Sequence, residues 1–233
     1  MSPHSHIVQL LAAFRHDETF YLLFPWAKGD LRCLWKETPK PILNTTLQSW
    51  VTGQLAGLAS AIRRIHQLPK IAKGRHGDIK PENILWFRTQ AGGHCGSVGG
   101  IFKLSDFGLS RINPKTDQNA IERPRGYSRT YRAPEFDVRG AIGSEYDIWS
   151  FGCVVLETAV WMVRGWNGVA SFAFSRAGRS GRGDDAFFAH VAPEKGQKPL
   201  VYLKPVVVYV RPTPALLQGI QLIFTVDQRP HSG

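Results

Sequence analysis

Apolar residues recur at helical spacing in one long stretch of the first third of the chain. Between residues 45 and 68 they stand four or three positions apart, at Leu47, Val51, Leu55, Leu58, Ile62 and Ile65. This period places them on one face, so the stretch predicts an amphipathic α-helix packed against a core. Thr45 and Gln48 have the spacing of a capping box, and Pro69 marks the expected end of the helix.

Two pairs of short apolar runs predict β-hairpins. The first pair, residues 6–14 and 19–24, turns at the charged letters RHDET and ends before Pro25. The second pair, ILWF at 84–87 and IFKLSDF at 101–107, flanks a Gly-rich connection. We therefore expect one hairpin near the N-terminus and a second that carries the polar loop 76–83 at one of its ends.

The second half of the chain alternates between irregular and strongly apolar stretches. Prolines, glycines and charges in residues 108–137 are typical of a surface segment. Residues 144–163 are apolar on nearly all sides, which predicts a buried helix. From Arg164 onward Gly, Ser and Arg dominate without periodicity, so we expect a loose or disordered segment. The stretches 203–210 and 215–226 could form either a helix or a strand.

The composition, 43% hydrophobic and 20% charged residues, is that of an ordinary globular protein and excludes disordered and fibrous classes. A formal net charge of +11 favours polyanionic partners. The basic residues are nevertheless scattered, so we expect no dedicated nucleic-acid binding. A basic nucleic-acid binder would instead show an affinity that falls steeply with salt.

The cysteines and the apolar runs indicate in which cellular compartment the protein is expected. Cys33, Cys95 and Cys153 lie far apart, and His94 beside Cys95 has no second pair at metal-ligand spacing, so neither a disulfide framework nor a zinc site is expected. A reducing, intracellular location follows, either cytoplasmic or nuclear. The N-terminus lacks signal-peptide features, and the longest apolar run, residues 149–163, is short for a bilayer, so no membrane span is expected.

Polar residues able to carry chemistry follow one another in a fixed order. HGDIKPEN at residues 76–83 precedes a strand, and then come DFG at 106–108, APE at 133–135 and an apolar helix that contains Asp147. Singly, such residues are more often turn residues or helix caps, and Asp147 itself fits a capping box begun by Ser144. The ordered set is much rarer and favours a catalytic loop.

These motifs resemble those of the eukaryotic protein kinase family over about residues 5–161, and they look most like variants seen in fungal kinase-like proteins. The resemblance implies an α+β, protein kinase-like fold with a mainly helical C-lobe and a remnant of a β N-lobe. It divides the chain into an N-lobe and hinge remnant at 1–28, a C-lobe core at 29–163 and a divergent, partly disordered remainder at 164–233.

The resemblance also implies an activity and its residues. A protein serine/threonine kinase transfers the γ-phosphate of ATP, with Mg²⁺ as cofactor, to a Ser or Thr hydroxyl of a protein substrate. Asp78 would accept the hydroxyl proton, Lys80 would place positive charge on the phosphate, and Asn83 completes the catalytic set. Asn83 and Asp106 would ligate the metal, since Mg²⁺ prefers oxygen ligands.

The nucleotide site is implied in the same way. Residues 23–27 resemble the hinge that lies along adenine, and the cofactor-binding set comprises Leu23, Phe24, Trp26, Asp30, Asn83 and Asp106. In this family an aspartate such as Asp147 anchors the catalytic loop from beneath. Arg229 resembles the arginine that pairs with Glu135, and Ser128 lies where the Ser/Thr branch usually has threonine.

The sequence departs from the family at several places. It contains no G-x-G-x-x-G loop, strand lysine or helix glutamate to hold the phosphates, so the upper lobe is expected to be truncated and this chain alone inactive. The alternative is a non-catalytic pseudokinase or regulatory binding module. Gly77 stands where most of the family has an arginine that receives a phosphorylated activation loop, so control by loop phosphorylation is not expected.

Overall fold

Helices and small antiparallel sheets make up this computed structural model, which describes residues 3–67, 72–88, 99–114, 126–139, 142–178, 183–191 and 200–209. The helices are α1 (Leu31–Glu37), α2 (Thr45–His66), α3 (Pro134–Arg139), α4 (Glu145–Arg176) and α5 (Pro205–Val208). The strands are β1 (Ala12–His16), β2 (Thr19–Leu23), β3 (Gly29–Asp30), β4 (Ala72–Arg75), β5 (Ile84–Phe87), β6 (Ile101–Leu104), β7 (Arg111–Pro114), β8 (Phe188–Val191) and β9 (Leu200–Leu203). Short 3₁₀ turns cover Pro81–Asn83 and Phe107–Leu109.

The amphipathic helix predicted from the apolar spacing is α2, and its buried positions include Leu47, Val51 and Leu58. The predicted capping box is wrong: the N-cap residue is Asn44, whose side chain accepts a hydrogen bond from the backbone N–H of Leu47. Asn is a strong N-cap because its short side chain reaches an N–H that has no partner in the first turn. The helix ends at His66, whereas Pro69 lies outside the described residues.

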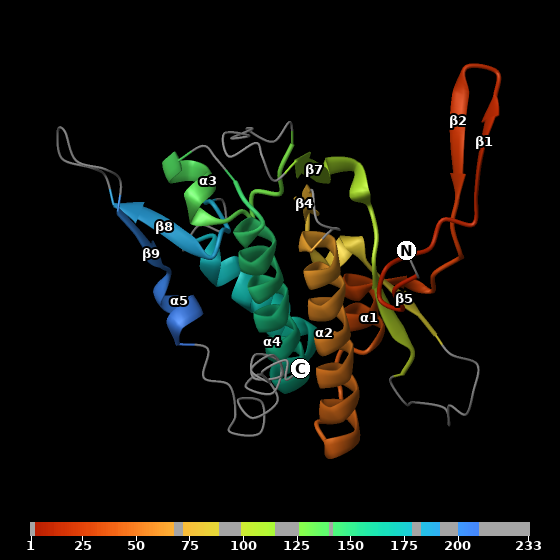
Figure 1. Cartoon of the computed structure of the whole chain (residues 1–233). Helices are drawn as coiled ribbons and strands as arrows, with labels where there is room; N and C mark the ends of the chain where they lie inside the picture. The colour runs from red at the N-terminus through yellow and green to blue at the C-terminus, as the bar shows by residue number, and fades with distance from the viewer. Residues whose placement is uncertain are drawn as a thin grey trace, which may run out of the picture.

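Both predicted hairpins are present. β1 pairs with β2, and β5 pairs with β6 and with β3 in a three-stranded antiparallel sheet. The first strand is shorter than predicted, because it begins at Ala12 and Ile7 makes only an isolated bridge to Leu104. Every residue of β1 and β2 is exposed, and the hairpin projects from the body of the protein in Figure 1.

The core lies where α1, α2 and α4 meet the β5–β6 hairpin, with α2 and α4 side by side in Figure 1. Leu34, Leu58, Phe102 and Trp161 are among its fully buried members. Helix α4 is long and apolar enough to cross a membrane by length and composition, but 72% of its most apolar window is buried inside the protein. It is therefore the central core helix, and it is longer than the apolar run in the sequence suggests.

The expectation of a loose segment from Arg164 onward is wrong for residues 164–176, which continue α4. The helix bends at Gly165, whose φ of 68° lies in the left-handed region. A Cβ at this position would clash with the Pro39 carbonyl oxygen, and that same oxygen accepts a hydrogen bond from the N–H of Trp166. Glycine allows this close approach, so the chain can bend and bury Val169 and Phe172. Within the undecided stretch 203–210, Leu203 ends β9 and residues 205–208 form α5, whereas residue 210 and the stretch 215–226 lie outside the described residues.

Candidate active site

Asp147 holds the start of the polar loop 76–83 from the first turn of α4. Its side chain is fully buried, and Oδ2 accepts hydrogen bonds from the backbone N–H of His76 and from Nε2 of His66, each at 2.8 Å. Oδ1 accepts the N–H of Gly77 at 2.8 Å. The capping-box interpretation is wrong, because Ser144 makes no side-chain cap bond. A buried carboxylate with three donors is a strong anchor, since hydrogen bonds to charged groups exceed neutral ones in strength.

The ring of His76 fixes the loop from the other side. Its Nε2 lies 3.0 Å from the Ser105 carbonyl oxygen, and its Nδ1 accepts the N–H of Asp78 at 3.3 Å. These partners require a neutral ring protonated on Nε2. Burial is the largest cause that lowers the pKa of His76, against the opposing effect of nearby carboxylates, so the neutral form dominates near pH 7. The ring also lies 4.9 Å from that of Phe107, which joins the loop to the DFG motif.

Gly77 adopts a left-handed conformation with φ 84°. A Cβ there would approach the Leu109 carbonyl oxygen to 2.9 Å. Where most of the family has an arginine, this chain has a residue that fits the turn without strain.

Asp78, Lys80 and Asn83 form one connected group. Oδ2 of Asp78 accepts from Lys80 Nζ at 2.6 Å and from Asn83 Nδ2 at 2.9 Å. The same amide nitrogen of Asn83 donates to the Asp78 carbonyl oxygen at 2.8 Å. Within the described residues, Oδ1 of Asp78 is buried and has no hydrogen-bond partner. The carboxylate is therefore oriented through one oxygen, and the acceptor capacity of the other is unused among the described residues.

Asp106 reaches the same end of the hairpin through the pairing of β5 with β6. Ile84 pairs with Leu104, and the N–H of Ser105 donates to the Asn83 carbonyl oxygen at 2.9 Å. Asn83 and Asp106 therefore flank the last paired residues of the two strands. Asp106 has φ 59°, its Oδ1 accepts the N–H of Gly108 at 3.2 Å, and its side chain is exposed. The His76 ring contacts both motifs: its Nδ1 accepts the N–H of Asp78, and it lies 4.9 Å from the ring of Phe107, the neighbour of Asp106 in sequence.

The proposed metal ligands number only two. Among the described residues no three His, Cys, Asp or Glu side chains gather as a metal site. Asn83 and Asp106 nonetheless offer an amide and a carboxylate oxygen, the donors that suit Mg²⁺, which usually binds few protein side chains and keeps waters or phosphate oxygens. The donor chemistry fits such an ion.

The hinge-side residues predicted for the nucleotide differ from this buried group in their exposure. Leu23, Phe24 and Trp26 are exposed, and Trp26 retains 94% of its surface. Asp30 is the N-cap of α1, and its Oδ1 accepts the N–H of Cys33 at 2.7 Å. The neighbouring Lys28 N–H donates to the Trp86 carbonyl oxygen at 2.9 Å, so the end of the hinge segment is bound to the β5–β6 hairpin.

A chain of hydrogen bonds that the sequence did not reveal joins the loop to the segment before α3. Arg32 donates to Glu82 at 2.6 Å and to the Tyr131 hydroxyl at 3.0 Å. Tyr131 donates to Glu157 at 2.7 Å, and Glu157 accepts from Arg176 at 2.7 Å in a fully buried ion pair. Burial and the Glu157 carboxylate raise the pKa of Tyr131 well above its usual value, so its hydroxyl keeps its proton. No local pattern signals these partners, because they lie far apart in sequence.

Other predicted contacts are not tested. Glu135 lies in the first turn of α3, but Arg229 is outside the described residues, as are His94 and Cys95. Ser128 is half-buried in the segment before α3.

Comparisons with known proteins agree with this arrangement of motifs. A family model described as "Protein kinase domain" matches residues 1–163. The chain is 31% identical over 156 residues to cyclin-dependent kinase 7 of Dictyostelium discoideum, covering 66% of this chain and 38% of the relative. It is 31% identical over 152 residues to human cyclin-dependent kinase-like 5, covering 65% of this chain and 14% of the relative. It is 30% identical over 154 residues to a probable serine/threonine-protein kinase, the KIN28 homolog of Encephalitozoon cuniculi, covering 65% of this chain and 42% of the relative.

The matches thus span less than half the length of these relatives. Residues 1–163, which the family model matches, contain the loop, the DFG and APE motifs and the first part of α4. The chain belongs to the eukaryotic serine/threonine protein kinase family.

Proposed function

We propose that this chain carries part of a protein serine/threonine kinase site, namely the residues that receive the substrate hydroxyl. Such a site transfers the γ-phosphate of ATP to a Ser or Thr hydroxyl of a protein substrate. The observation that carries the proposal is the buried Asp78 carboxylate, with Oδ2 held by Lys80 and Asn83 and Oδ1 without a partner in the described part of the chain. A substrate hydroxyl that donates to Oδ1 would be oriented for attack, and its proton would pass to that oxygen.

The other residues act on charge and position. Lys80 stands 2.6 Å from Asp78 and would lend positive charge to the phosphoryl group in transfer. Asn83 and Asp106 would hold Mg²⁺, which supplies charge neutralisation on the phosphates when bound. Leu23, Phe24, Trp26 and Asp30 would contact the nucleotide from the hinge side.

The proposed architecture is that of the family: a mainly helical C-lobe core over 29–163, the last strands of a β N-lobe over 1–28, and a divergent remainder over 164–233. The sequence contains no G-x-G-x-x-G motif that could form a phosphate loop. Loss of one preorganised donor costs about 10²- to 10³-fold in rate, so we propose that this polypeptide by itself has negligible turnover. Its compartment would be the cytoplasm or nucleus, in keeping with the free thiols Cys33 and Cys153.

A specific observation favours the second candidate, a non-catalytic pseudokinase or regulatory binding module. The side chains of Leu23, Phe24 and Trp26 are exposed, and Trp26 retains 94% of its surface. The loop would then serve as a scaffold, and the exposed hinge would contact a protein.

A Mg-ATP thermal shift separates the two candidates. With nucleotide at about ten times Kd, binding adds about 1.4 kcal/mol, which raises Tm by roughly 3–5 °C for a chain of this size. Asp106→Asn should abolish most of this shift. Asp17→Asn is the matched control, because Asp17 and Asp106 are the two non-glycine residues with positive φ in the described chain and both are exposed. No shift in the parent protein would favour the binding module, and an unchanged shift in Asp106→Asn would remove Asp106 from the proposed site.

A further inference from the structure

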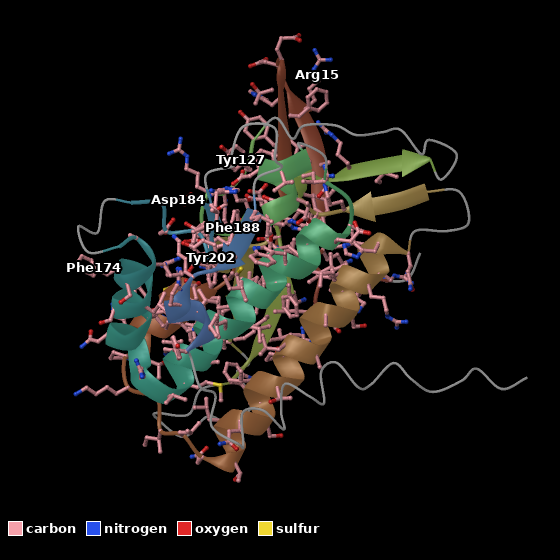
Figure 2. The ribbon with its side chains drawn as sticks, turned by 90° about the vertical axis from the view of Figure 1, so that its left-hand side faces the viewer. Arg15, Tyr127, Phe174, Asp184, Phe188 and Tyr202 are labelled. Atoms are coloured by element: carbon pink, nitrogen blue, oxygen red, sulfur yellow. The ribbon has the colours of Figure 1, made fainter. Side chains whose placement is uncertain are left out.

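Two aspartates from the stretch after α4 bind the segment that precedes and begins α3. Arg132 donates from Nη2 to Asp184 Oδ2 at 2.5 Å and from Nε to Asp137 Oδ2 at 2.9 Å. Thr130 Oγ1 lies 2.8 Å from both carboxylate oxygens of Asp185. Figure 2 shows Asp184 and Phe188 on the same face of the protein, with Tyr127 above them and Arg15 far off at the tip of the hairpin.

We propose that Asp184 and Asp185 form a permanent latch, which holds residues 127–137 in place without phosphorylation. Much of the family orders this region when a phosphate group on it binds the arginine that precedes the catalytic aspartate, but this chain has Gly77 there. In the latch the charges are reversed relative to that arrangement. The segment supplies the cation, Arg132, and the body of the protein supplies fixed carboxylates.

The latch is itself held rigidly against α4. Arg176 donates from Nε to the Asp185 carbonyl oxygen at 3.0 Å, and Lys204 Nζ donates to the Asp184 carbonyl oxygen. The Arg176 guanidinium also lies 4.1 Å from the ring of Phe187 and is paired with the buried Glu157. Both aspartates are thus fixed through their backbone as well as their side chains, which lowers the entropic cost of ordering the facing segment.

The Arg132 side chain has the surroundings of a structural cation. It retains only 7% of its surface, also donates to the Arg129 carbonyl oxygen at 2.5 Å, and its guanidinium lies 5.0 Å from the ring of Phe188. The hydrogen bond from Arg132 is the largest cause that lowers the pKa of Asp184, so the carboxylate stays ionised near neutral pH. A bidentate guanidinium–carboxylate pair with a second carboxylate at Nε is among the stronger polar contacts available to a protein.

Added phosphate would disrupt these contacts. Arg132 is paired with the carboxylates of Asp137 and Asp184, and the carboxylate of Asp185 faces the Thr130 hydroxyl. A phosphate on the Thr130 hydroxyl would break its bond to Asp185 and place like charges in contact. The latch also forms one wall of a cavity of about 360 Å³ that reaches Tyr127 and Gly183, and its rigidity fixes the shape of that cavity.

Hydrogen exchange on the full, phosphatase-treated chain tests the latch without nucleotide, so the result is independent of whether the proposed transfer activity is correct. In the parent protein, peptides covering residues 127–137 should exchange slowly although no phosphate is present. Asp184→Asn and Asp185→Ala should each speed exchange in these peptides roughly tenfold or more, as expected for loss of a hydrogen bond to a charged group. Peptides from α2 should be unchanged and thereby show that the variants are folded.

Thr130→Val provides a second, milder variant that removes only one hydroxyl. It should speed exchange as much as Asp185→Ala does, and combining the two substitutions should add nothing, because both break the same contact. Asp17→Asn should leave the exchange of 127–137 unaltered. Rapid exchange of 127–137 in the dephosphorylated parent, or rates within twofold of the parent in Asp184→Asn and Thr130→Val, would overturn the proposal.

Discussion

Asp147→Asn is the substitution that most directly tests how the polar loop is held. The exchange preserves the shape of the side chain and its place in α4 but replaces one acceptor oxygen by an NH₂ group. In the parent, three N–H donors converge on the two oxygens: the backbone N–H groups of His76 and Gly77, and the ring of His66. The variant must place its NH₂ group against at least one of them.

The magnitude follows from this count. With its amide oxygen in the Oδ2 position, the substituted side chain keeps the bonds to His76 and His66 and loses the one to Gly77. A hydrogen bond to a charged group contributes about 1.5–3 kcal/mol, and the two retained bonds weaken once the charge is gone. We therefore expect a loss of about 2–4 kcal/mol in the free energy of unfolding, against a total of roughly 5–15 kcal/mol for a natural domain.

Urea denaturation followed by tryptophan fluorescence measures this loss, and hydrogen exchange of peptides containing His76 and Gly77 localises it. Asp17→Asn is again the matched control, since the Asp17 side chain is 87% exposed and its removal should change stability by less than about 0.5 kcal/mol. An Asp147→Asn protein as stable as this control, with unaltered exchange at 76–77, would mean that the carboxylate does not anchor the loop.

Two further outcomes follow from the fold. Gly165→Ala should destabilise the protein by roughly 2–5 kcal/mol, because the new Cβ would sit on a left-handed backbone and clash with the Pro39 carbonyl oxygen. Gly152 lies in the same helix with open space around it, so Gly152→Ala should be neutral or stabilising by up to about 1 kcal/mol. Equal thermal unfolding temperatures for the two variants would contradict the close approach of Gly165 to Pro39. Acidification should also destabilise the native state, because burial is the main cause that lowers the pKa of His4, His6 and His76 below 6.5, so the unfolded chain takes up protons first. The free energy of unfolding should therefore fall as the pH drops below about 6.5 and be flat above about pH 7.5, and a stability that rises between pH 7 and 5.5 would contradict this sign.

Local periodicity was sufficient to predict the main elements of the fold. The spacing of Leu47, Val51 and Leu55 identifies α2, and the mostly apolar run before Val163 identifies the buried part of α4. The alternation of short apolar runs and polar turns likewise identifies the β5–β6 hairpin. These features depend on neighbours within a few residues, which is why the sequence alone reveals them.

Features that depend on distant partners were missed or left open. Residues 164–176 look unstructured by composition, yet they are helical because Val169 and Phe172 pack against the core once the chain has bent at Gly165. Asp147 could not be assigned between cap and anchor from spacing, because its donors come from α2 and from the polar loop. The same limit applies to Asp184, whose partner Arg132 lies 52 residues away in sequence. Tertiary contact, rather than propensity, decided each of these cases.

The polar loop and the hinge segment of the proposed site are held by different contacts. We therefore expect nucleotide binding and the geometry of the catalytic loop to respond differently to a perturbation. Asp78 is buried and oriented by contacts within the loop, which is in turn tied to α4 by Asp147, so its geometry does not depend on bound nucleotide. Leu23 and Trp26, by contrast, have exposed side chains that nucleotide or another polypeptide would have to order. Because ordering of each rotamer-rich side chain costs about 0.5–1.5 kcal/mol, we expect the affinity of this chain for nucleotide to be low. Addition in trans of a polypeptide that covers the exposed β1–β2 hairpin should therefore lower the Kd for Mg-ATP while leaving the hydrogen exchange of residues 76–83 unchanged.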